Sequence, residues 1–416
     1  MGRNMRGPVP AILGRNTAGL FHGLLAGVVF FSIHAALVAH HVYFGASKRG
    51  TVDAPAPPAF YEPAPLRQES HSHALNRWDA LLYESIARHG YQPPMDVLLP
   101  WFPGYPILAK GVALATRLPV PATLTLLSAV ATLGFWLLLW SPRLRSALGS
   151  KTVAIASILV LAWPGAFFWF AGMTEPWVAF LMLAVLAAWL SNRRAAALVL
   201  CGLAASFKQV FALVGCMLVL LRWLKERERP MAVFLWLIAS WSGLLAYAFY
   251  CAVFHGSPVA FAQAGYPIYG RILTLRALFD LPNFARHAWT LNGGTAIAVY
   301  GLAIAAAAVW LVRQRGRIAW REMAENEIPL SVLLWTVGGA CMALYIAFDA
   351  YGFSPFRFTN FLRYQTTNVA HFLLAAYVLR QVRTRALCMT LLPLAAVGLY
   401  WQNELTVRYW NWWWVA

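Results

Sequence analysis

The chain has 416 residues, of which 60% are hydrophobic and only 12% are charged, and its mean hydropathy is +0.59. A soluble protein would carry roughly twice that charged fraction, and repeated apolar runs approach the ~20 residues that cross a bilayer as a helix. These values exclude a soluble globular protein. They predict an all-α polytopic membrane protein, with residues 1–416 forming one integral-membrane domain.

The first apolar run, residues 19–42, is too long for the core of a signal peptide, and further apolar runs follow it. We interpret it as a retained signal-anchor. The loop after it, residues 43–119, contains a short amphipathic helix at 77–90. At about 100° per residue, Arg77, Glu84 and Arg88 share one stripe, which we interpret as a solvated face.

Asp79 lies on nearly the opposite side of that helix, together with Leu82, Tyr83 and Ile86. A carboxylate on an apolar face against a membrane is costly unless it has a partner. It could be a buried, hydrogen-bonded acid that only fixes the loop. The alternative is a general base at the bilayer surface, and we take Asp79 as the candidate catalytic residue.

Two later segments decide the number of spans. Residues 103–117 are apolar but short, and we expect them to lie flat on the outer surface, so that 120–140 is the next span. Residues 195–221 are too short for two full crossings. We interpret them as a hairpin whose apex, at 206–209, stops below the outer surface; a single tilted span is the alternative.

Basic residues occur in six clusters between apolar runs, and these clusters hold 19 of the 33 basic residues. Placing all six in the cytoplasm follows the positive-inside rule. It predicts about eleven spans, a cytoplasmic N-terminus and an outer C-terminus with an aromatic anchor at 410–414. The outer face then carries the first loop at 43–119 and a second at 253–292. The clusters are Arg3/Arg6/Arg15, Arg143/Arg145/Lys151, Arg193/Arg194, Arg222/Lys225/Arg227/Arg229, Arg313/Arg315/Arg317/Arg321 and Arg380/Arg383/Arg385.

The same distribution argues against nucleic-acid binding, because no soluble segment interleaves basic and aromatic residues. The five cysteines all lie in apolar runs without metal-like spacing, so we expect small hydrophobic side chains in helices. We therefore expect no disulfide framework, no metal site and no cofactor.

Polar residues at the predicted outer ends of spans form the candidate site: Asp79, Glu175, Lys208, Arg357, Arg363 and Tyr364. Lysine and arginine would hold a phosphate, and arginine can engage two of its oxygens. The acid would accept a hydroxyl proton as that oxygen attacks. Simpler roles exist: Arg363 could reach the interface or pair with Asp349, and Glu175 could only cap a helix or partner Lys208.

Several motifs resemble the PIG-V-like mannosyltransferases, which include the enzyme that adds the second mannose to glycosylphosphatidylinositol and a set of bacterial relatives. The resemblance runs from about residue 20 to 380. It is carried by Arg77-Trp78-Asp79-Ala80 with Ile86-Ala87-Arg88-His89-Gly90-Tyr91, by Trp101-Phe102-Pro103-Gly104-Tyr105-Pro106, by Trp163-Pro164-Gly165-Ala166-Phe167-Phe168 with Thr174-Glu175, and by Arg363-Tyr364.

The resemblance implies a GT-C type bundle with amphipathic surface helices in the first outer loop, and an inverting, metal-independent sugar transfer from a polyprenyl-phosphate donor. It implies a lipid-linked or glycan acceptor, mannose as the sugar, and Asp79 as the base. Lys208, Arg363 and Arg357 would bind the donor phosphate. Supporting or acceptor roles would fall to Arg77, Trp78, Glu175, His89, Tyr91 and Tyr364.

The chain also departs from that family. Lys208-Gln209 stands where the family usually has Arg-Pro, and Pro176 replaces the common Ser after Glu175. The positive charge is kept at Lys208, but the sugar and the acceptor are left open by these changes, as is the oligomeric state.

Two other functions compete with this interpretation. A transporter or lipid or glycan flippase would share the spans, but it would place ionisable residues near mid-bilayer in corresponding positions of two halves. A non-catalytic subunit of a glycan assembly complex is the other. The expected compartment is the bacterial inner membrane, with the site facing the periplasm; the alternative is the equivalent position in the endoplasmic reticulum.

Overall fold

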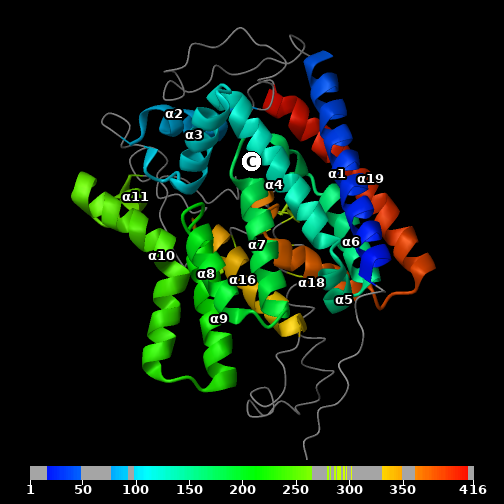
Figure 1. Ribbon diagram of the computed structural model, residues 1–416. Helices are drawn as coiled ribbons and strands as arrows, with labels where there is room; N and C mark the ends of the chain where they lie inside the picture. The colour runs from blue at the N-terminus through cyan, green and yellow to red at the C-terminus, as the bar shows by residue number, and fades with distance from the viewer. Residues whose placement is uncertain are drawn as a thin grey trace, which may run out of the picture.

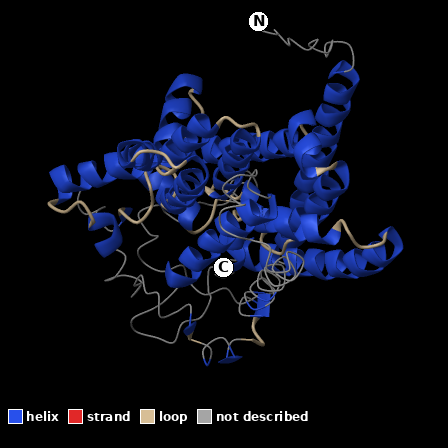
Figure 2. Cartoon of the chain, turned by 90° about the horizontal axis from the view of Figure 1, so that it is seen from below, coloured by secondary structure: helices blue, strands red, loops and turns tan. Residues whose placement is uncertain are grey.

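The computed structural model describes residues 16–47, 76–91, 98–264, 330–348 and 361–410, together with isolated residues between 279 and 301. Within these residues the chain is helical and contains no strand, as the all-α prediction requires (Figure 2). Arg357, and the pairing of Arg363 with Asp349, lie outside the described residues, as does all but Trp410 of the anchor predicted at 410–414.

The long apolar helices form the frame of the molecule. They are α1 (Asn16–Ser47), α4 (Val120–Leu139), α10 (Pro230–His255) and α19 (Thr384–Trp410). Each contains an uninterrupted stretch of 20 to 27 apolar-rich residues, long enough to cross a bilayer. A bent pair, α5 (Pro142–Leu148) and α6 (Ser150–Leu161), turns by 103° at Gly149 and could supply a fifth span. The described chain therefore has the features of a helical membrane protein.

The following helices of the described chain are shorter. They are α7 (Glu175–Leu190), α8 (Arg194–Ala204), α9 (Val210–Glu226), α11 (Ala260–Gln263), α16 (Leu330–Phe348), α17 (Phe361–Gln365) and α18 (Val369–Leu379). The eleven expected spans include several of these, and residues 302–329 are not described. The number of spans and the GT-C bundle therefore stay predictions.

Two amphipathic helices follow α1 in the first loop: α2 (Asp79–His89) and α3 (Gly104–Thr116). Both pack against α4, and Figure 1 shows them at the end of the molecule opposite the α9–α10 connection. In α3 the buried side chains are Tyr105, Pro106 and Ala109, whereas its second half is mainly exposed. This fits a helix with only one face against the bundle.

The prediction of a solvated stripe on a helix at 77–90 is partly wrong, and α2 begins only at Asp79, so that Arg77 precedes it. Arg88 is exposed, but Arg77 and Glu84 are 4% and 5% exposed. The reason is that α2 packs against two neighbours, α3 and α4, rather than resting on a surface by one face. Glu84 is stabilised there by an ion pair with Arg88 at 2.6 Å.

Basic connections gather on the side away from α2. Arg145 on α5 donates to the carbonyl oxygen of Gly19 near the start of α1. Lys151 donates to Val382 O at 2.9 Å, which joins α6 to the α18–α19 connection. Arg194, the first residue of α8, forms an ion pair with Glu226, the last residue of α9, and so joins the two open ends of the α8–α9 hairpin. Four of the six basic clusters thus belong to connections that contact one another in pairs.

The 206–209 apex joins α8 to α9 as the predicted hairpin requires. The backbone N–H of Gly104, the first residue of α3, donates to Ser206 O at 2.8 Å. A Cβ on Gly104 would lie 2.6 Å from Ser206 Oγ and 2.8 Å from the Ser206 carbonyl carbon. Only glycine allows the start of α3 to approach the apex this closely.

Candidate active site

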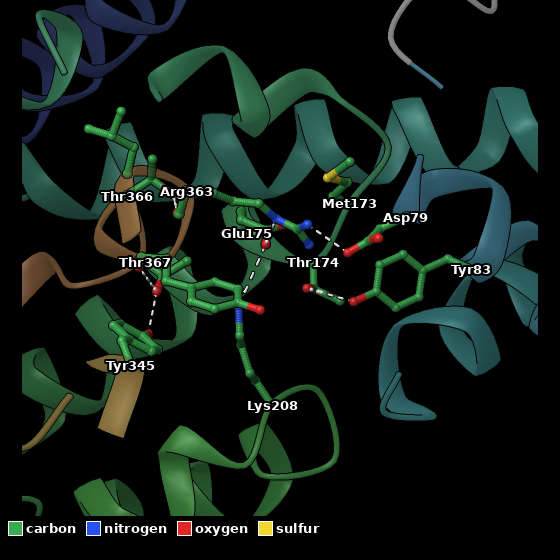
Figure 3. A network of polar contacts seen from close by, with 12 residues as sticks. Asp79, Tyr83, Met173, Thr174, Glu175, Lys208, Tyr345, Arg363, Thr366 and Thr367 are labelled. Atoms are coloured by element: carbon green, nitrogen blue, oxygen red, sulfur yellow. Dashed lines mark hydrogen bonds and ion pairs between the residues drawn. The ribbon is translucent and has the colours of Figure 1, made fainter. Parts of the chain in front are cut away.

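Four charged side chains from four separate segments meet in one cluster, which we call the charged quartet: Asp79, Glu175, Lys208 and Arg363 (Figure 3). Asp79 begins α2, Glu175 begins α7, Lys208 lies at the hairpin apex, and Arg363 lies on α17. All four were chosen from the sequence as site residues. The predicted site needs the acid and the cations to converge, and the structure brings Arg363 into contact with Asp79 and Glu175, and Lys208 into contact with Glu175.

Arg363 is the centre of the charged quartet. Its Nη1 lies 2.6 Å from Asp79 Oδ2, and its Nε donates to Glu175 Oε1 at 2.7 Å. The side chain of Arg363 is 3% exposed, that of Glu175 is 0% exposed, and that of Asp79 is 12% exposed. Buried charges at this density persist only when they are paired, so each of these groups depends on the others.

Lys208 reaches the same carboxylate from the other side. Its Nζ lies 3.6 Å from Glu175 Oε1 and 4.3 Å from the centre of the Tyr364 ring, which gives it an ion pair and a cation–π contact. Burial lowers the pKa of Lys208 from 10.5 to about 8, although the charge of Glu175 acts in the opposite direction. Lys208 is therefore the one cation of the quartet that can lose its proton at moderately alkaline pH.

Tyr83 and Thr174 connect the two acidic segments. The Tyr83 hydroxyl and Thr174 Oγ1 are hydrogen-bonded at 3.1 Å, and Thr174 directly precedes Glu175. Burial raises the pKa of Tyr83 well above its usual value, and the charges of Glu175 and Asp79 raise it further, so the phenol stays neutral. Tyr83 was not chosen from the sequence, but the signal existed, because it lies one helical turn after Asp79 on the same face.

The backbone before Asp79 is held in an unusual conformation. Trp78 has a φ of 53°, in the left-handed region that non-glycine residues rarely adopt. The carbonyl of Arg77 accepts hydrogen bonds from Ala80 N at 3.1 Å and from the Tyr409 hydroxyl at 2.8 Å. The predicted supporting residues Arg77 and Trp78 therefore shape the turn that directs Asp79 toward the quartet.

Two further contacts place the segments that carry Glu175 and Arg363. Trp163 Nε1 donates to Leu362 O at 2.9 Å, beside Arg363. Gly172, three residues before Glu175, has a φ of 65°, and a Cβ there would lie 2.1 Å from Asn76 Oδ1. The 163–175 turn thus packs closely against both the Asp79 segment and α17.

Two of the predicted supporting residues are not brought to the quartet. His89 is exposed at the far end of α2, and ten residues of helix separate it from Asp79 by about 15 Å. The Tyr91 hydroxyl donates to Trp101 O, and its ring contacts Tyr247 and Tyr250 in a separate aromatic cluster. Tyr364, in contrast, lies beneath Lys208.

Aromatic residues that sequence reasoning missed surround the quartet. Phe168 lies 5.7 Å from the Arg363 guanidinium, and Tyr409 packs against Phe167 and Phe168. The Tyr345 ring centre lies 5.9 Å from Lys208 Nζ, and the Tyr345 hydroxyl is hydrogen-bonded to Thr367 Oγ1. No local pattern indicated Tyr409 or Tyr345, because both come from helices far away in the sequence.

The quartet has the groups needed to hold an anion and to accept a proton. In the described part of the chain, no three His, Cys, Asp or Glu side chains are grouped as a metal ion would require. The expectation that the site uses no metal therefore stays a prediction.

Comparisons with protein-family models, with curated proteins and with solved structures found no match to this chain.

Proposed function

We propose that this protein is an inverting GT-C type glycosyltransferase. It would move a sugar, mannose by resemblance, from a polyprenyl-phosphate donor to a lipid-linked or glycan acceptor on the non-cytoplasmic side of the membrane. The observation that supports this most strongly is the contact of Asp79 with Arg363 inside a buried cluster that also holds Lys208 and Glu175.

The proposed roles follow from chemistry. Arg363 and Lys208 hold the donor phosphate, because a planar guanidinium can engage two phosphate oxygens while the ammonium acts as a point charge. Asp79 accepts the proton of the acceptor hydroxyl. Glu175 positions both cations, since one of its oxygens contacts each of them.

Inversion follows from a single displacement. The acceptor oxygen attacks the anomeric carbon on the face opposite the phosphate, and the bond from that carbon to the phosphate oxygen breaks with its electron pair. The phosphate leaves as a monoester that the two cations stabilise. Chemistry of this kind requires one base and anion-binding groups, which the quartet contains.

Asp79→Asn tests the proposal. The amide keeps the shape of the side chain but cannot accept the hydroxyl proton, so transfer from a radiolabelled polyprenyl-phosphate mannose should fall by about 10²- to 10⁴-fold. The assay uses purified protein in lipid nanodiscs with a membrane extract as the acceptor source. Other polyprenyl-phosphate hexoses are tested in parallel, because mannose rests on the resemblance alone.

Glu84→Gln is the matched control, because Glu84 is a second buried carboxylate on α2 that pairs with Arg88. Its transfer rate should stay close to that of the wild type. Near-normal transfer by Asp79→Asn would show that Asp79 is not the base that accepts the hydroxyl proton. Absence of transfer or hydrolysis by the wild type with every donor would remove the proposed function.

A further inference from the structure

Arg363 is engaged by both carboxylates of the site, including the proposed base. Its Nη1 is 2.6 Å from Asp79 Oδ2, while its Nε donates to Glu175 Oε1 at 2.7 Å. A carboxylate oxygen in contact with a guanidinium is directed at that cation rather than at an acceptor hydroxyl. The group proposed to bind the donor phosphate therefore also occupies the group proposed to take the proton.

The net charge of the quartet determines what happens when a phosphate enters. The two acids and two bases of the quartet sum to zero formal charge, and Lys208 also contacts Glu175. A phosphate entering the site brings negative charge and must compete with a carboxylate for a cation. If the Asp79–Arg363 ion pair stayed in place, the phosphate would lie close to a buried carboxylate of like charge and would lack its full contact with Arg363, which is costly.

Asp79 is the carboxylate that a phosphate can displace from Arg363 more easily. Glu175 is fully buried, contacts both cations, and begins α7, where the helix dipole favours a negative charge. The Asp79 side chain is 12% exposed, and among the described residues its ion pair is with Arg363 alone. Displacing Asp79 breaks one ion pair, whereas displacing Glu175 breaks two.

We propose that the donor phosphate replaces Asp79 on Arg363, so that donor binding releases the base and transfer proceeds in the order donor first, acceptor second. This inference rests on the proposed function. Glu175 keeps its bond to Arg363 Nε and serves as the pivot about which the exchange occurs. In the absence of donor, Asp79 stays engaged and the acceptor hydroxyl finds no base.

The transfer step then proceeds without a change in the charge of the buried site. The quartet plus a phosphodiester donor carries a net charge of −1. When the acceptor oxygen bonds to the anomeric carbon, the phosphate gains one negative charge and Asp79 becomes neutral by taking the proton. The sum remains −1, so the low-dielectric surroundings do not oppose the reaction by accumulating charge.

The test measures binding rather than turnover. Farnesyl monophosphate serves as the probe, a short prenyl phosphate whose affinity is measured by isothermal titration in nanodiscs. Asp79→Asn removes the competing charge from Arg363, so this variant should bind the probe about tenfold more tightly than the wild type, because a hydrogen bond to a charged partner is stronger than one to a neutral amide. Glu84→Gln should bind like the wild type.

The outcomes separate the inference from the proposed function. If the wild type binds the probe and Asp79→Asn binds it equally or more weakly, the exchange is wrong while the proposed function survives. If no prenyl phosphate binds to the wild type, both fail. Tighter binding by Asp79→Asn, together with loss of binding in Arg363→Ala, supports the exchange.

A measurement on the wild type avoids dependence on the folding of a variant. A cryo-EM map with the probe bound should place Asp79 more than 4 Å from the Arg363 guanidinium, with a phosphate oxygen in its place. A map in which the probe is bound and the Asp79–Arg363 contact is retained would overturn the exchange.

Discussion

At the scale of single residues, the ionisation of Lys208 controls how strongly the site attracts an anion. Burial lowers the pKa of its ammonium to about 8. A cation whose pKa lies near 8 is charged below that pH and becomes neutral above it. In the proposed mechanism, the site therefore loses one of its two phosphate-holding charges as the pH rises through 8.

This predicts the shape of the pH profile. The value of kcat/KM, which reports groups of the free enzyme, should be level near neutral pH and fall about tenfold per pH unit above about 8. Lys208→Arg keeps the charge throughout, because a guanidinium stays protonated in proteins. The alkaline decline should therefore disappear in that variant, even if its rate is lower.

Initial rates between pH 6 and 10 check this prediction. The thermal stability of both proteins is followed over the same range as a control for unfolding. An alkaline decline at the same pH in wild type and Lys208→Arg would show that another group is responsible.

Residues such as Lys208 could be recognised from the sequence for a physical reason. In a chain with only 12% charged residues, an ionisable group within an apolar run is expensive and stands out. Lys208 was found in this way, whereas Asp79 was found because it lies on the apolar face of an amphipathic segment, and Glu175 and Arg363 because they lie at the predicted outer ends of spans. Tyr409 could not be found, because its contact with Arg77 joins residues 332 positions apart and no local pattern encodes such a distance.

At the scale of elements, the site depends on how closely the start of α3 approaches the hairpin apex. Gly104 N donates to Ser206 O at 2.8 Å, and Lys208 lies two residues further along the apex. A Cβ on Gly104 would also meet Phe207 Cδ2 at 2.8 Å. Any added atom must displace the apex, and with it Lys208, from its present position.

Gly104→Ala should therefore impair the proposed transfer activity, even though alanine favours helices. Overpacking of this kind costs about 1–3 kcal/mol of stability, and displacement of a binding group can cost up to about 100-fold in rate. We expect a lower melting temperature and at least a tenfold loss of transfer. Gly111→Ala is the matched control in the same helix, because a Cβ there meets nothing within 4 Å. Equal behaviour of the two variants would contradict the proposed role of the close contact.

The sequence predicts which face of an amphipathic helix is apolar, but it does not predict which polar residues become buried when a helix packs against two neighbours. The apolar face of α2 was identified correctly, but the burial of Glu84 was not, because periodicity does not reveal that both α3 and α4 cover the helix. The hairpin with its apex at 206–209 was anticipated because residues 195–221 are too few for two full membrane crossings. The number of membrane spans is harder to predict, because the length of a short apolar helix such as α18 does not show whether it crosses the membrane.

At the scale of the whole molecule, the proposed function requires the quartet and the basic connections to face opposite sides of the membrane. Arg143 on α5 belongs to a region without acidic residues, where α5 and α6 contact the α18–α19 connection and the start of α1. Positive charge of this kind is retained on the cytoplasmic side. Helices α2 and α3, which carry or support the site, would then face outward.

Cysteine labelling tests this orientation. Lys110 on α3 and Arg143 on α5 are both exposed, and each is replaced by cysteine in a Cys388→Ser background, because Cys388 is the exposed native thiol among the described cysteines. A membrane-impermeant maleimide should label Lys110→Cys in right-side-out vesicles and Arg143→Cys only in inverted ones. Labelling of both from the same side would place the quartet and the basic connections on the same side of the membrane. A donor presented on the non-cytoplasmic leaflet could not then reach Arg363, and the proposed direction of transfer would have to be reversed.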